Sequence, residues 1–402
     1  MRHRWKWISA LIIAAILGFG SWLRHQPARP ALSGSIPASP LSAPALLTPA
    51  WPGGISSPAV VAHGKPDHSD EIEVCGIGKV KLDPDDLPAH GNYFEALSKS
   101  ARLHWLATLR KSDDDRARAG GLYLEGILDR DSPQKDSEAA RGELVQLAAA
   151  TKDPAIFALA YIKCAKDGGD LASCPQFNLD DWAHSDADNA VPWLQLAAKA
   201  RREGDGTAEA SAMAHAAQAH QYQTYSWSVF SFAQSAMPND VTATERWILT
   251  TQVIGVEAAM LAPFQPLFQY CSHDAQSDIA VHRQCSALAE LMVGKAATLL
   301  DLSVGKSLGA RVGWPAERVD GLTQETKASM WAINEMTGTD PKQQWTCDGV
   351  ARGNAYMTQL AELGERGLAR QGIEDSGESV AELSRKYDEW LAAMVHEAAA
   401  QP

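Results

Sequence analysis

Residues 189–217 read NAVPWLQLAAKARREGDGTAEASAMAHAA, and this stretch decides the fold. Apolar residues recur at intervals of three and four on either side of Gly204-Asp205, a pair of residues that interrupts helices. We expect one helix at about 189–203 and a second at about 207–236. The stretch therefore predicts a helical hairpin.

An earlier stretch is similar to the first half of this hairpin. Residues 154–170 align with residues 190–206 at a shift of 36 positions, and Phe157 then matches Trp193. A repeat period in the thirties is typical of helical hairpins that stack on one another. The alignment therefore predicts at least two such units.

The hairpin resembles a tetratricopeptide repeat. Trp193, Leu196 and Ala197 stand where this family has the packing residues of its first helix, and an alanine-rich second helix follows the Gly-Asp turn. The resemblance covers residues 154–222, where the second copy matches the repeat well and the first copy matches it poorly. In the second copy Ala200 stands where the family usually has an aromatic residue. The resemblance implies that the first helix packs against the small residues of the second, and that hairpins stack as an α-solenoid.

The same helical spacing continues through almost all of the chain after Pro88. We expect an all-α fold with a helical-repeat region at 71–240 and a C-terminal helical region at 241–402. The exception is 71–82, where alternating apolar residues predict a short strand pair or extended strap. The expected helices are 91–111, 114–129, 136–151, 154–167, 189–203, 207–236, 242–262, 277–304, 316–336, 350–370 and 378–398.

The first residues have the pattern of a membrane anchor. The expected cytoplasmic tail at 1–6 contains three basic residues, Arg2, Arg4 and Lys6. An uncharged apolar run at 7–23 follows it. This run is long enough to span a bilayer of ~30 Å, which predicts a single-pass protein of the bacterial inner membrane with its bulk in the periplasm. A cleaved signal peptide is the alternative, because Gly18-Phe19-Gly20 has the small-x-small form of a cleavage site. Residues 24–70 are rich in Pro, Ala and Ser and predict a linker.

The charge of the chain restricts its partners. Six of the 36 basic residues and none of the 49 acidic residues precede Asp67, so residues 67–402 carry 30 basic and 49 acidic side chains, a net charge of −19. Such a field repels phosphate groups and anionic lipids. We therefore expect no nucleic acid and no nucleotide as a ligand, and neutral or basic partners.

Six cysteines in an exported chain predict three disulfides. Proximity in the sequence favours Cys164–Cys174 and Cys271–Cys285, which leaves Cys75 to pair with Cys347. A zinc site is the alternative for one pair, because Cys271 and Cys285 stand close to His273 and His282. Thiols in an oxidising compartment more often bond to each other, and we therefore expect no metal and no cofactor.

Two further features are candidates for function. Glu257 stands alone in an apolar run, where a raised pKa would suit a general acid, although a carboxylate paired with another helix has the same pattern. The densest aromatic cluster predicts core packing, or a groove for a peptide. Its members are Tyr222, Tyr225, Trp227, Phe230 and Phe232.

We expect binding rather than catalysis, with no catalytic residue assigned. The favoured function is a membrane-anchored periplasmic scaffold whose acidic concave surface binds a protein or peptide partner in the cell envelope, held at the inner membrane through residues 7–23. The alternatives are an extracytoplasmic enzyme that acts on cell-wall or peptide material, with Glu257 in the active role, and a structural subunit of an envelope complex. These expectations rest on analogy at the level of the fold.

Overall fold

The structure is a computed structural model that describes residues 70–82, 87–128, 134–165, 171, 174–258, 264–272, 277–337 and 343–399. The predicted anchor at 7–23 and the linker up to residue 69 lie outside these ranges, so the anchor stays a prediction. No helix within the described ranges is both long and apolar enough to cross a membrane.

The described chain is mostly helical, which confirms the all-α prediction at the level of fold class. It forms one β-hairpin followed by α-helices. The elements of the first half are β1 (Asp70–Val74), β2 (Gly78–Leu82), α2 (Leu87–Arg110), α3 (Asp115–Leu124), α4 (Gln134–Thr151), α5 (Pro154–Cys164), α6 (Leu179–Ser185), α7 (Ala190–Glu203) and α8 (Gly206–Gln218). The second half consists of α9 (Ser228–Ser235), α10 (Ala243–Ala258), α11 (Gln265–Tyr270), α12 (Ile279–Lys295), α13 (Leu299–Arg311), α14 (Ala316–Thr337), the 3₁₀ turn η2 (Gln343–Trp345), α15 (Cys347–Ser376) and α16 (Val380–Ala399).

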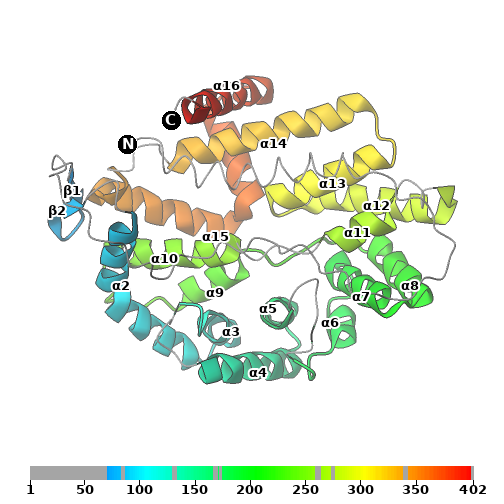
Figure 1. The fold of residues 1–402 in the computed structure, drawn as a ribbon, viewed down its shortest axis with the longest axis horizontal. Helices are drawn as coiled ribbons and strands as arrows, with labels where there is room; N and C mark the ends of the chain where they lie inside the picture. The colour runs from blue at the N-terminus through cyan, green and yellow to red at the C-terminus, as the bar shows by residue number, and fades with distance from the viewer. Residues whose placement is uncertain are drawn as a thin grey trace, which may run out of the picture.

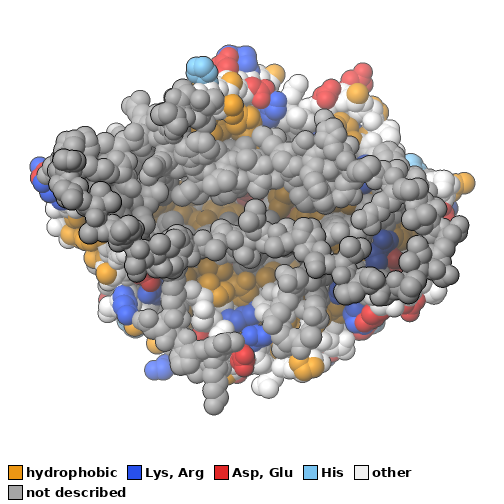
Figure 2. Space-filling view, in the orientation of Figure 1, with side chains coloured by type: hydrophobic (Ala, Val, Ile, Leu, Met, Phe, Trp, Pro, Cys, Tyr) orange, Lys and Arg blue, Asp and Glu red, His pale blue; other side chains and the backbone are white. Residues whose placement is uncertain are grey.

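The helices form an arc closed by a second layer. Helices α2, α4, α6, α7 and α8 follow the lower rim in Figure 1, with α3 and α5 just inside it, and neighbours in the sequence pack against each other. Helices α9 and α10 lie inside this arc, where α9 packs on α3 and α10 packs on α2 and α15. Helices α12 to α16 form the upper half of the view. In the space-filling view of the same face, hydrophobic side chains gather in the middle, over α9, α10 and α15 (Figure 2).

The hairpin of α7 and α8 follows from its local sequence. Asn189 and Asp205 cap the two helices, since their side chains accept hydrogen bonds from backbone N–H groups of the first turns. Gly204 ends α7 in the left-handed conformation, with a φ of 75° that glycine adopts without strain. Trp193 of α7 stacks on His215 of α8 at a ring-centroid distance of 4.4 Å. Membership of the repeat family stays a prediction.

The β-hairpin is fastened to the helical body at its turn, as expected for a strand pair at 71–82. The two strands are antiparallel, with Ile72 opposite Val80. Cys75 in the turn forms a disulfide with Cys347 at the start of α15 and accepts a hydrogen bond from Thr244 on α10 at 2.7 Å. A long disulfide loop of this kind restricts the unfolded chain strongly.

Two predicted helices are interrupted, and the prediction of their continuity was wrong. The expected helix at 207–236 is divided into α8 and α9, because residues 219–227 bond to a distant corner of the chain. The expected helix at 277–304 is divided into α12 and α13, because Thr298 caps a new helix by accepting a bond from the Asp301 N–H. The short helices α6 and α11 were not predicted.

Candidate functional site

Residues 219–227, which join α8 to α9, pass through the centre of the molecule, and we call them the edge segment. Gln221 forms a parallel bridge with Asn189, and its N–H donates to the Asp188 carbonyl at 3.0 Å. Two residues further on, the Asn189 side chain exchanges two hydrogen bonds with the backbone of Gln223, both at 2.9 Å. One side of the edge segment is thus fully bonded to the corner that precedes α7.

The other side of the edge segment makes no backbone hydrogen bonds to the described chain. Successive residues of an extended chain direct their N–H and C=O groups to opposite edges. Within the part of the chain that the structure describes, the backbone groups of Tyr222 and Thr224 have no hydrogen-bond partner. The backbone groups of Tyr222 are thus unpaired but enclosed, because the residue is 1% exposed.

The end of the edge segment is strained. Tyr225 and Trp227 have φ angles of 56° and 71°, which residues with a side chain rarely adopt. The Tyr225 hydroxyl donates to Asp186 at 2.9 Å, and Glu257 accepts the N–H of Trp227 at 2.9 Å. Backbone strain of this kind is kept where surrounding contacts fix it, and it clusters at functional sites.

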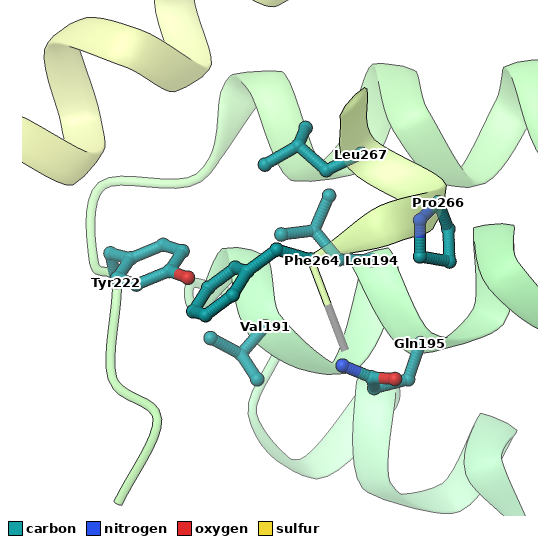
Figure 3. Close-up of a pocket in the computed structure, with 7 residues that line it drawn as sticks. All are labelled: Val191, Leu194, Gln195, Tyr222, Phe264, Pro266 and Leu267. Carbon is teal, nitrogen blue, oxygen red and sulfur yellow. The ribbon is translucent and has the colours of Figure 1, made fainter. Parts of the chain in front are cut away.

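A pocket adjoins the edge segment. It is a small, partly open cavity with a volume of about 20 Å³, which is roughly the room that one water molecule needs. Most of its wall is apolar and comes from α7 and α11, with Tyr222 from the edge segment (Figure 3). The lining residues are Val191, Leu194, Gln195, Tyr222, Phe264, Pro266 and Leu267.

Two polar side chains line this pocket although both are almost fully buried. Gln195 is 5% exposed and Tyr222 is 1% exposed. The Gln195 carbonyl accepts the Tyr161 hydroxyl at 2.6 Å, while its amide nitrogen and the Tyr222 hydroxyl have no partner within the described ranges. The pocket thus offers one free donor and one hydroxyl among apolar walls, which is the usual composition of a binding pocket.

Carboxylates flank the edge segment at both ends. Asp188 is exposed beside His220, whose hydrogen bond at 2.7 Å lowers the pKa of this carboxyl. Near the other end, burial raises the pKa of Asp186, and burial raises the pKa of Asp301 to about 6. The Asp301 carboxylate accepts the Thr224 hydroxyl at 3.4 Å. The site is therefore acidic.

One half-buried carboxyl, that of Glu365, lies where α15 bends. Gly364 interrupts this helix with a φ of 68°, and two residues later the N–H of Arg366 bonds to the Ala297 carbonyl at 3.1 Å. Glu365 accepts the N–H of Leu299 at 3.0 Å. Burial raises the pKa of Glu365 to about 7, and the charge of Asp301 raises it further.

The three disulfides are the predicted pairs, two that proximity in the sequence favoured and one formed by the two remaining cysteines. They are Cys75–Cys347, Cys164–Cys174 and Cys271–Cys285, with Cα separations of 4.5, 5.6 and 5.8 Å. These distances lie in the ordinary range for a disulfide. Three disulfides indicate an oxidising, extracytoplasmic environment.

The zinc alternative loses both of its thiolates to the disulfide between α11 and α12. His282 remains on α12, whereas His273 lies outside the described residues. No group of three or more His, Cys, Asp and Glu side chains in the described ranges is arranged to hold a metal ion.

Glu257 and Lys163 have structural partners. The two Glu257 oxygens accept the N–H groups of Trp227 and Phe230, so this carboxylate caps α9, which has no cap of its own. Burial raises its pKa. The Lys163 ammonium donates to three backbone carbonyls at the end of α3 and in the turn after it, at 2.6 to 2.9 Å. With its oxygens bonded in this way, Glu257 is not placed as a general acid.

The aromatic cluster divides between core and site. Phe230 and Phe232 on α9 are buried in the main hydrophobic core, together with Tyr222, whose hydroxyl reaches the pocket. Tyr225 and Trp227 are partly buried at the strained turn. The clustering in the sequence thus marks the edge segment, although the groove itself depends on α7 and α11.

The chain matches no protein-family model, and comparison with curated proteins and with solved structures found no similar protein. Its function is therefore argued from the geometry alone.

Proposed function

We propose that this chain is an extracytoplasmic helical scaffold that binds a peptide segment of a partner protein in the cell envelope. The disulfides support an oxidising compartment. The basic start and apolar run at 7–23 favour attachment to the inner membrane of a bacterium, with the helical body in the periplasm.

The observation that carries the proposal is the pocket between α7, α11 and the edge segment. Its apolar walls would contact one small apolar group of a partner, and Gln195 and Tyr222 supply hydrogen-bonding atoms beside it. Hydrogen-bonding atoms held at fixed positions beside an apolar wall orient a ligand and give specificity. This arrangement fits a peptide anchor better than a reaction, since Glu257 is occupied as a helix cap.

The pocket wall is fixed before any partner arrives. Cys271, directly after α11, is bonded to Cys285 on α12, which holds the helix that carries Pro266 and Leu267. Arg311 of α13 also lies over the Phe268 ring at 4.7 Å. Rigid binding surfaces lose less conformational entropy on association. The disulfide therefore supports binding as well as stability.

Site-specific photo-crosslinking in living cells tests this function. A photoreactive residue in place of Leu194, half-buried in the pocket wall, should give a discrete adduct with an envelope protein. The same residue in place of Val395, which is 61% exposed on α16, serves as the matched control and should give none. The Tyr222→Phe change should weaken the adduct because it removes only the pocket hydroxyl.

Two results contradict the proposal. The first is the absence of an adduct from position 194 when the protein is folded and oxidised. The second is an adduct pattern that is the same from positions 194 and 395, since random collisions produce such a pattern.

A further inference from the structure

We propose that the Cys75–Cys347 disulfide is a redox latch, which a dithiol protein of the cell envelope reduces in order to release the β-hairpin from α10 and α15 while the helical body stays folded. The inference goes beyond the proposed function, since it uses neither the pocket nor the edge segment. It gives the chain a second kind of partner, a thiol–disulfide oxidoreductase.

The first support is access to the sulfur atoms. Cys347 is exposed at the start of α15, and Cys75 is partly exposed in the turn of the hairpin. The cysteines of the other two disulfides are at most 1% exposed. A thiol must approach a disulfide sulfur directly in order to reduce it. A protein that carries the attacking thiol can therefore reach this disulfide and not the other two.

The second support is the separation of the hairpin from the main core. The hairpin lies at one edge of the molecule, beside α2 and the start of α15 (Figure 1). Ile72 and Val74 are buried against Phe94 and Trp345, in a small cluster that is distinct from the main hydrophobic core. A two-stranded hairpin is at best marginally stable by itself. It therefore depends on its attachment, and its release leaves the main core intact.

The third support is the position of the disulfide at the joint between hairpin and body. The Cys75 N–H donates to the Trp345 carbonyl at 2.8 Å, and the Thr244 hydroxyl donates to the Cys75 carbonyl at 2.7 Å. Both hydrogen bonds hold the residue that the disulfide also holds. Because the disulfide joins positions 272 residues apart, opening it frees Cys75 to move over a wide range. The two hydrogen bonds and the apolar contacts of the hairpin should then weaken together.

The reduction is an exchange of thiols and disulfide. A thiolate of the dithiol protein attacks Cys347, the more exposed of the two cysteines; a mixed disulfide forms, and the Cys75 sulfur leaves and takes up a proton. The second thiol of the partner then attacks the mixed disulfide and releases Cys347 as a thiol. The partner ends as a disulfide, having passed two electrons and two protons to this chain.

Access is tested with the full chain, purified without reductant, and a thioredoxin whose resolving cysteine is replaced by serine. This probe stops at the mixed disulfide. Peptide mapping by mass spectrometry should find the probe on Cys347. A probe attached to a cysteine of the other two disulfides, or no adduct at all, overturns the proposal.

Release is tested by amide hydrogen exchange before and after treatment of the full chain with dithiothreitol mild enough to open only this disulfide. The N–H of residue 75 should exchange about 10-fold or more faster after reduction, whereas the N–H groups of α7 and α8 should not change. The Cys75→Ser, Cys347→Ser double variant is the control. It should show the fast exchange without reductant and no further change with it.

The two parts of the proposal can fail separately. Unchanged exchange at residue 75 in the reduced parent chain overturns release of the hairpin, whether or not the double variant folds. Loss of the helical far-ultraviolet signal when only this disulfide is open shows that the disulfide supports the whole fold, and this result overturns the latch.

Discussion

Replacing Glu365 by glutamine should make the protein more stable at neutral and basic pH. Burial raises the pKa of this carboxyl from 4.5 to about 7, so the folded chain binds its proton more tightly than the unfolded chain does. The contribution of Glu365 to stability is complete below pH 4.5 and is lost as the pH rises through 7. Glutamine cannot ionise, and it keeps an oxygen for the Leu299 N–H.

The size of the effect follows from linkage. A rise in the pKa of Glu365 from 4.5 to about 7 lowers the free energy of unfolding at high pH by about 3 kcal/mol, since each pKa unit is worth 1.36 kcal/mol. The change takes place between pH 4.5 and 7. We therefore expect the free energy of unfolding of the Glu365→Gln variant to exceed that of the parent chain by about 1–3 kcal/mol at pH 8. At pH 4.5 the two free energies should be equal.

Urea unfolding of the oxidised protein at pH 4.5, 6 and 8, followed by far-ultraviolet circular dichroism, measures this difference. The control is Glu362→Gln, an exposed glutamate on the same helix, which should behave as the parent chain does. A variant at Glu365 that is less stable than the parent at pH 8, or whose stability varies with pH as the parent's does, refutes the reasoning.

Three further predictions concern stability. The Cys75–Cys347 disulfide should be the first to open under mild reductant, because Cys347 is exposed and the other two bridges are buried; mass spectrometry of labelled thiols checks the order. The Glu257→Ala change should cost about 2–4 kcal/mol in chemical denaturation, because two buried N–H groups at the start of α9 lose their acceptor; an unchanged midpoint contradicts its role as a cap. The Gly121→Ala change should destabilise the protein, since the added Cβ would lie 2.8 Å from a side chain of α2. The Gly294→Ala change, which has open space on α12, should stabilise the protein by about 0.5–1 kcal/mol. Thermal melts that rank the two variants in the opposite order refute this account of the packing.

The features that local sequence determines could be predicted. The hairpin of α7 and α8 depends on Asn189, Gly204 and Asp205, which lie at the ends of the helices that they begin or terminate. The two short disulfides join cysteines 10 and 14 residues apart, so proximity was a sound guide. The third pair then followed as the remainder.

The features that depend on distant contacts could not be predicted. Alanine-rich spacing continues past Gln218, yet the helix stops there because His220 and Gln221 bond to the Asp188 carbonyl, some 32 residues earlier. The lone carboxylate of Glu257 was visible, but its partners lie in the first turn of α9 and only the fold brings them together. Tertiary bonding overrides local propensity in such cases.

The pocket had only a partial signal in the sequence. Tyr222 belonged to the aromatic cluster, and the peptide-groove alternative for that cluster is the one developed in our proposal. Gln195 and Phe264 had no distinguishing pattern, because a polar residue on an amphipathic helix is normally exposed. Only the packing of α11 against α7 places these residues around one cavity.

Site-specific photo-crosslinking tests the central claim, that the pocket between α7, α11 and the edge segment binds an envelope protein, most directly. A photoreactive residue in place of Leu194 in the pocket wall should give a discrete adduct with an envelope protein. The same residue in place of Val395, which is 61% exposed on α16, should give none. The absence of an adduct from position 194 in the folded, oxidised protein, or the same adduct pattern from both positions, would contradict the account.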